Sequence, residues 1–220
     1  ANGEGPNGKR QVYDWPRVFG TVKRLQPDAV IFSDAGPDVR WCGNERGEAG
    51  DPNWSTIDPA AVPFPGATGD GIIEALQHGH PDGSVWRPAE ADVSIRPGWF
   101  YHPAQDDKVR DAENLFELYL KSVGRNSKLL LNVPPTPDGL LHDRDAASLL
   151  GFRDRLAAFN DRVVQGAFGR GEVALSRPTR IDAVRLAENV ETGQAVSRYV
   201  VRGLSDAGWR DLTRGTTIGY

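Results

Sequence analysis

The sequence lacks methionine altogether and contains a single cysteine, Cys42. Because translation starts with methionine, we predict that residue 1 is not a translation start and that these 220 residues are a piece of a longer protein. A lone cysteine excludes a disulfide within the chain and a metal site built from cysteines. Long apolar runs are also missing, since none approaches the roughly 20 residues that span a bilayer. No membrane partner is therefore expected.

An excess of charge of one sign is missing too. The chain has 26 Lys and Arg against 30 Asp and Glu, and the two signs are interspersed. Nucleic acid binding needs a basic face, so no nucleic acid partner is expected. No glycine-rich phosphate loop follows an apolar run, which argues against nucleotide-dependent phosphoryl transfer or redox chemistry. The 39% hydrophobic content, with 6 Trp, 8 Phe and 5 Tyr, is typical of a globular chain with a sizeable core.

Hydrophobic periodicity predicts alternating strands and helices up to about residue 165. The expected helices are 11–25, 107–123 and 145–164, and the expected strands are 28–34, 91–95 and 128–133. Residues 35–90, rich in Gly and Pro, are expected to form a long functional loop. This rhythm predicts an α/β fold with a parallel sheet, either open and doubly wound or closed as a barrel.

The pattern changes from Glu172 onward. Residues 180–186, 195–201 and 209–212 alternate with period two between turn residues, which predicts part of an antiparallel β-sandwich. We therefore expect two domains, 1–168 and 169–220.

Four motifs carry a family resemblance. They are Arg-Trp-Cys-Gly-Asn-Glu at 40–45, Asn-Trp-Ser-Thr at 53–56, Glu-Ala-Asp-Val-Ser-Ile-Arg-Pro-Gly-Trp-Phe-Tyr-His at 90–102, and Leu-Leu-Asn-Val-Pro-Pro at 130–135 followed by Asp138-Gly139. In this order they resemble the family 29 glycoside hydrolases, the α-L-fucosidases. The resemblance implies the C-terminal half of a (β/α)8-like barrel up to about residue 165, followed more loosely by an incomplete β-sandwich. The Trp-Cys-Gly-Asn-Glu form is similar to the branch that acts on α-1,3 and α-1,4 fucose in Lewis-type glycans.

The resemblance implies a retaining mechanism with an Asp nucleophile and a Glu acid/base. Glu45 matches the acid/base, and the nucleophile would lie just upstream of Ala1, outside this sequence. Glu90, at the mouth of an expected strand, is the runner-up acid/base, although it could instead pair with an arginine as support. Asp34 is the one stand-in for a nucleophile within the chain, and a turn-capping role fits it better.

Aromatic and basic residues near these motifs are candidates for sugar binding. Ring faces pack on pyranose C–H groups, yet large aromatic residues are just as common in cores. Arginines could donate to hydroxyls or orient a carboxylate, or could form ordinary ion pairs. The candidates are Arg40, Trp41, Trp54, Glu90, Arg96, Trp99, Tyr101 and His102, with Asn132 as a strand-end residue that could reach the site. His78 and His80 lack a third ligand, so no metal and no cofactor is expected.

The sequence thus predicts a portion of a retaining α-L-fucosidase, inactive alone, whose partners are a fucosylated glycan and the missing N-terminal half of the barrel. The alternative is a non-catalytic glycan-binding or scaffold fragment, because half a barrel exposes strand edges and lacks its nucleophile. Family members usually act outside the cytoplasm, which favours a periplasmic or secreted location.

Overall fold

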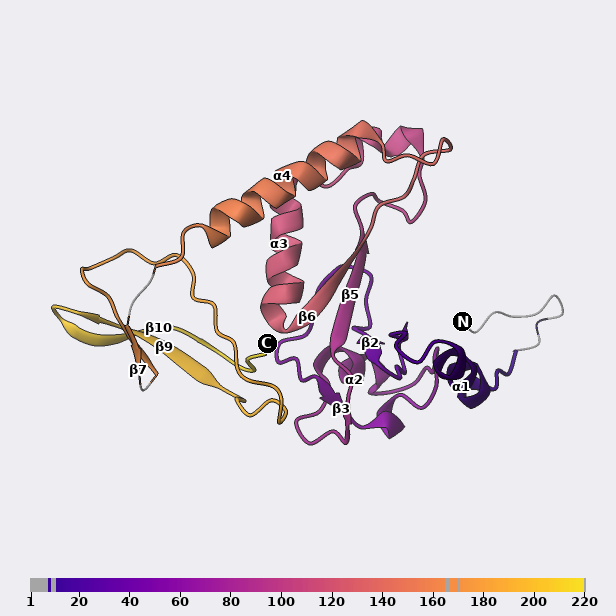
Figure 1. Cartoon of the computed structure of the whole chain (residues 1–220), viewed down its shortest axis with the longest axis horizontal. Helices are drawn as coiled ribbons and strands as arrows, with labels where there is room; N and C mark the ends of the chain where they lie inside the picture. Colours follow the sequence, from indigo (N-terminus) through magenta and orange to yellow (C-terminus); the bar gives the residue numbers. More distant parts are fainter. Residues whose placement is uncertain (1–7, 9–10, 165–166, 170, 220) are drawn as a thin grey trace.

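The computed structural model describes residues 8, 11–164, 167–169 and 171–219 (Figure 1). Its helices are α1 (Trp15–Leu25), α2 (Ile72–His78), α3 (Ala112–Ser122) and α4 (Asp143–Asn160), with short 3-10 turns η1 (Pro59–Ala61), η2 (Pro103–Lys108) and η3 (Val123–Arg125). Its strands are β1 (Phe32–Ser33), β2 (Val39–Trp41), β3 (Thr56–Ile57), β4 (Val85–Trp86), β5 (Ala89–Ser94), β6 (Ser127–Asn132), β7 (Ala167–Gly169), β8 (Glu172–Ala174), β9 (Tyr199–Ser205) and β10 (Gly208–Gly215).

A four-stranded parallel sheet forms the centre of the molecule. Its order is β1-β2-β5-β6, so parallel strands lie side by side in chain order, with no reversal. A doubly wound sheet reverses its strand order at a switch point, whereas a (β/α) barrel does not. Of the two alternatives left open by the periodicity, the order is that of a barrel segment.

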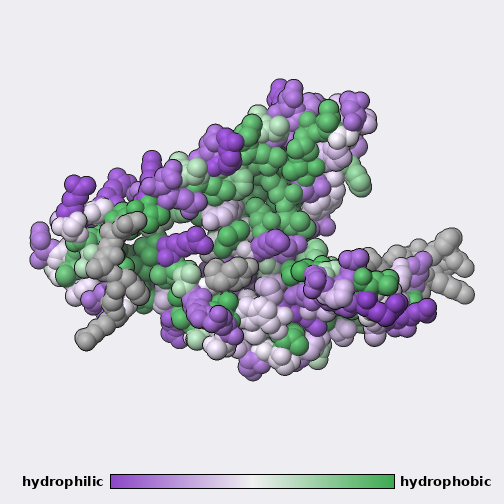
Figure 2. Space-filling view, viewed as in Figure 1, coloured by the Kyte–Doolittle hydropathy of each residue, from purple (hydrophilic) through white to green (hydrophobic). Residues whose placement is uncertain are grey.

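The sheet has one helix-covered face and one open face. Along β5, Val93 packs with Leu115 and Leu118 of α3, so it points toward the helices. Because side chains alternate along a strand, Glu90 and Asp92 point to the opposite face, which is the interior in a barrel. Figure 1 shows α3 and α4 together on one side of the sheet, and Figure 2 shows hydrophobic residues gathered in the same region.

The predicted helices exist, but capping residues move their starts. Asp111 accepts a hydrogen bond from the backbone N–H of Asn114 (2.8 Å), so α3 begins at Ala112 and not at residue 107. Asp14 caps α1 in the same way, and α1 begins at Trp15 rather than residue 11. N-cap side chains satisfy helix N–H groups that have no partner within the helix, which fixes where a helix can begin.

The expected long loop at 35–90 is a structured segment, which corrects the prediction. It contains β2, the β3–β4 pair, α2 and a core cluster that includes Ile57, Val62 and Leu76. Periodicity does not predict strand β2, because it has only three residues and a polar one at its centre.

The C-terminal part forms two antiparallel pairs, β7 with β8 and β9 with β10. The predicted boundary after residue 168 falls within β7, whose neighbouring residues 165–166 and 170 lie outside the described part. No strand forms at 180–186, contrary to the expectation, because the apolar side chains there stay exposed and find no partner strand among the described residues. Within the same part of the chain, no helix is both long and apolar enough to cross a membrane.

Candidate active site

Glu45 lies in the loop that follows β2, at the carboxyl end of the sheet. Two backbone bonds fasten this loop to β5: the N–H of Cys42 donates to Glu90 O and the N–H of Gly47 donates to Asp92 O, both at 3.1 Å. Within the loop, the buried Asn44 donates to Glu48 O (2.8 Å) and accepts from the N–H of Arg46 (2.9 Å). The Gly-Asn-Glu motif is thus a braced turn that exposes the Glu45 carboxylate at the end where barrel active sites form.

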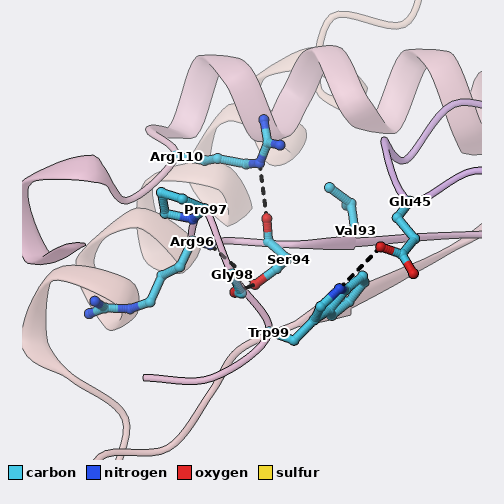
Figure 3. Close-up of a pocket in the computed structure, with 8 residues that line it drawn as sticks. All are labelled: Glu45, Val93, Ser94, Arg96, Pro97, Gly98, Trp99 and Arg110. Carbon is cyan, nitrogen blue, oxygen red and sulfur yellow. Dashed lines mark hydrogen bonds between the residues drawn. The ribbon is translucent and has the colours of Figure 1, made fainter. Parts of the chain in front are cut away.

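Trp99 contacts Glu45, and both residues line a small hollow. The indole Nε1–H of Trp99 donates to Glu45 Oε2 at 3.2 Å, and Figure 3 shows the two side chains facing one another. Asn132, at the end of β6, donates to Trp99 O (3.1 Å) and to Ser94 Oγ (3.0 Å), so it holds the Trp99 segment against the sheet. The hollow measures about 120 Å³ and is lined by Glu45, Val93, Ser94, Arg96, Pro97, Gly98, Trp99 and Arg110.

Arg96 lines this hollow, but its guanidinium forms ion pairs with aspartates outside the hollow. Its guanidinium is buried, contacts both carboxylate oxygens of Asp145 (2.9 and 3.1 Å) and donates to Asp106 (2.9 Å). Burial opposes the charge, but the bonds to the two aspartates outweigh it and raise the pKa of Arg96. Figure 3 shows the guanidinium directed away from Glu45 and Trp99. Arg96 therefore links the segment that follows β5 to Asp145 on α4, and a contact of Arg96 with substrate stays a prediction.

Arg40 also lies away from the hollow. The parallel register sets Arg40 beside Ala89, on the helix side of the sheet, and Trp41 beside Glu90 on the open face. The fully buried Arg40 donates to Asn53 Oδ1 (2.7 Å), Trp54 O (2.7 Å), Leu76 O (3.1 Å) and Arg87 O. Burial lowers the pKa of Arg40 to about 10. Arg40 therefore holds the structure together behind the sheet, and the buried Trp54 belongs to the same network.

Two carboxylates stand on the open face of β5. Glu90 is nearly buried and lies 3.9 Å from Lys128 Nζ; burial raises its pKa and Lys128 offsets part of the rise. Asp92 Oδ1 accepts a 2.6 Å hydrogen bond from Trp41 Nε1, and burial together with the charge of Glu45 raises the pKa of Asp92. Sequence reasoning missed Asp92, although alternation from Glu90 along the same strand could have found it.

The remaining candidates take supporting positions. His102 is exposed and lies at the start of η2, and the Tyr101 ring stacks on the Arg96 guanidinium 4.8 Å from its centre. Asp34 accepts from the N–H of Gly66 (2.7 Å), 32 residues further along the chain, so it joins two loops, whereas Ser33 Oγ makes the bond within the local turn to Gly36 O. His78 and His80 each bond to backbone atoms. Over the described ranges, no group of three or more His, Cys, Asp or Glu could hold a metal ion.

Fold and site together define a class of protein: part of a (β/α) barrel with carboxylates gathered at and below the carboxyl end of its sheet. A sequence profile of the family described as "Alpha-L-fucosidase" matches residues 64–159. The rice (Oryza sativa subsp. japonica) protein named "Putative alpha-L-fucosidase 1" is 35% identical over 97% of this chain and 47% of its own length. "Alpha-L-fucosidase 1" of Arabidopsis thaliana is 42% identical over 76% of this chain and 32% of its own length.

Among solved structures, a GH29 fucosidase of Ruminococcus gnavus in complex with fucose is similar with a TM-score of 0.82 and 26% identity, over 99% of this chain and 52% of that one. The chain belongs to glycoside hydrolase family 29, the α-L-fucosidases. It spans about a third to a half of the length of the curated relatives it matches.

Proposed function

We propose that the full-length protein containing this chain is a retaining α-L-fucosidase that removes terminal fucose from glycans, with Glu45 as its acid/base. The observation that carries the proposal is the exposed Glu45 carboxylate, held by the Trp99 indole at the carboxyl end of the sheet. The proposal includes the Lewis-type α-1,3 and α-1,4 linkages to which the Trp-Cys-Gly-Asn-Glu form points, and a periplasmic or secreted location.

The nucleophile in this proposal is an Asp upstream of Ala1. Its carboxylate attacks the anomeric carbon of fucose and forms a glycosyl ester, while Glu45 gives its proton to the departing glycosidic oxygen. Water then attacks the ester carbon, and ionised Glu45 takes the proton from that water. Trp99 occupies Oε2 of Glu45, so Oε1 is the oxygen left to carry the proton to and from the reacting oxygens.

An aryl α-L-fucoside with a good leaving group tests the role of Glu45. The leaving group needs no proton, so Glu45→Gln and Glu45→Ala should spare formation of the ester and slow its hydrolysis by about 100-fold or more. Azide attacks without a base, so it should restore turnover of Glu45→Ala and yield a fucosyl azide of retained configuration. Glu48→Gln is a matched control on the same loop, where the carboxylate binds Lys121.

Each other outcome has a distinct meaning. Normal turnover of the Glu45 variants, with azide rescue of Glu90→Ala instead, would move the acid/base to Glu90. If the wild-type full-length protein binds fucosylated glycans without hydrolysing any fucoside, the non-catalytic glycan-binding function replaces the enzymatic one.

A further inference from the structure

Two indole–carboxylate pairs stand next to one another in this site. In one, Trp99 Nε1 donates to Glu45, the proposed acid/base, at 3.2 Å. In the other, Trp41 Nε1 donates to Asp92 at 2.6 Å. The second bond is shorter than the usual range for an N–H···O hydrogen bond, so the indole and the carboxylate are in close contact.

Asp92 connects the two pairs through its backbone. Its carbonyl oxygen accepts from the N–H of Gly47 at 3.1 Å, so the residue that holds the Trp41 ring also anchors the loop that carries Glu45. Burial raises the pKa of Asp92, and the negative charge of Glu45 adds to the rise. Asp92 therefore binds Trp41 through its side chain and the loop of Glu45 through its backbone.

The ring and the carboxylate depend on one another. Asp92 is the acceptor for the Trp41 indole N–H among the described residues, and Trp41 is half-buried. An indole N–H left without an acceptor in such a place is unfavourable, so the ring cannot rotate freely away from Asp92. The register of β2 on β5 sets Trp41 beside Glu90 on the open face, where its half-buried ring also packs against the core cluster that contains Ala35 and Val62.

We propose that Asp92 is a positioning residue for the fucosidase reaction, which holds the Trp41 ring on the open face of β5 as a stacking surface for the sugar. The inference rests on the proposed function. It assigns a role to a carboxylate that is neither the acid/base nor its runner-up, and it makes Trp41 the residue through which Asp92 acts.

A double-mutant cycle in the full-length protein tests the proposal. Asp92→Ala removes the acceptor, and Trp41→Phe removes the donor but keeps a ring. Each should raise KM for an aryl α-L-fucoside by about tenfold, the loss of one hydrogen bond, with a smaller change in kcat because a stacking surface binds substrate and transition state alike. The double variant should be no worse than either single one, since both remove the same interaction. Asp92→Asn keeps an acceptor oxygen and should restore KM to within about threefold of wild type.

Additive effects of the two substitutions, or an unchanged KM in Asp92→Ala, would overturn the proposal. The control is Glu117→Gln, an exposed acid on the outer helix α3, which should leave KM and kcat unchanged.

A second measurement separates this inference from the proposed function. In protein with 15N-labelled tryptophan, the Trp41 side-chain N–H signal, assigned by its absence in Trp41→Phe, should move in Asp92→Ala and lose its response to added L-fucose. This readout needs no turnover, so a wild-type protein that fails to hydrolyse fucosides still decides the role of Asp92. A fucose response that is the same in wild type and Asp92→Ala, or absent from both, would overturn it.

Discussion

Gly47 is one of the residues that fix the loop of Glu45 against β5. Its φ is +74°, and a Cβ placed there would lie 2.9 Å from Val93 Cγ1 and 3.1 Å from Leu118 Cδ2. Left-handed backbone costs an L-residue about 1–2 kcal/mol, and the forced contacts add about 1–3 kcal/mol. Because the Gly47 N–H bonds to Asp92 O, the strain falls on the loop of Glu45.

We therefore expect Gly47→Ala to lower both the free energy of unfolding, by about 2–4 kcal/mol, and kcat/KM. Gly139→Ala is a matched control, since Gly139 has a similar φ of +77° but open space around it. It should show the backbone cost alone and keep full activity. Urea unfolding and aryl fucoside turnover measure both effects; equal losses in the two variants would contradict the role assigned to the contacts of Gly47.

At the scale of single residues, the sequence predicted which residues belong to motifs better than it predicted where their side chains point. Two separate motifs named Glu45 and Trp99 as candidates, and the structure brings the two side chains into contact. Arg40 could not be placed in advance because its direction depends on the register of β2 against β5, and that register is a long-range contact. Arg96 finds its partner Asp145 on α4, 49 residues further along the chain.

Strand β5 carries two acidic side chains, Glu90 and Asp92, on the same face of the sheet. Burial raises the pKa of both Glu90 and Asp92. An acid whose pKa is higher in the folded than in the unfolded chain binds its proton more tightly when folded. Its stabilising contribution is present below the unfolded pKa, about 4, and is lost as pH rises through the folded pKa.

Variants that cannot ionise should therefore gain stability at neutral pH. We expect Glu90→Gln and Asp92→Asn to be more stable than wild type at about pH 7 and to lose this advantage toward pH 4. Denaturant unfolding across that range measures the difference, with Glu117→Gln as an exposed control on α3. A gain that is independent of pH would mean that burial of the charge is not its cause.

Elements were predictable where the periodicity was long and unpredictable where tertiary contacts define them. Helices α3 and α4 follow from their apolar spacing, with boundaries shifted by their caps. Strands β1 and β2, of two and three residues, owe their existence to pairing and not to their own composition, because β2 pairs with β5 and β1 pairs in turn with β2.

On the scale of the whole molecule, the C-terminal segment returns to the end of the sheet opposite to Glu45. Gln194 Oε1 accepts from the N–H of Ser55, and Gln194 Nε2 donates to Ile218 O, both at 2.6 Å. Thr217 Oγ1 accepts from the N–H of Asn53 at 3.1 Å. Asn53 donates to the backbone of Asn126, just before β6 begins, which places these bonds at the amino end of the sheet. That end of a barrel serves stability, whereas the carboxyl end serves catalysis.

Gln194→Ala should therefore loosen the C-terminal segment without touching the chemistry. It removes two hydrogen bonds and leaves the N–H of the buried Ser55 without its acceptor, a loss of about 1–3 kcal/mol. Protease should then cut faster within 175–198, the stretch without helix or strand, while kcat stays within about twofold of wild type. Gln194→Glu keeps the acceptor for Ser55 and removes the donor to Ile218, so its cutting rate should fall between those of wild type and Gln194→Ala. If Gln194→Ala lowered kcat in proportion to the rise in cutting rate, the prediction would be wrong. The bonds of Gln194 at the amino end of the sheet would then be coupled to catalysis at the carboxyl end.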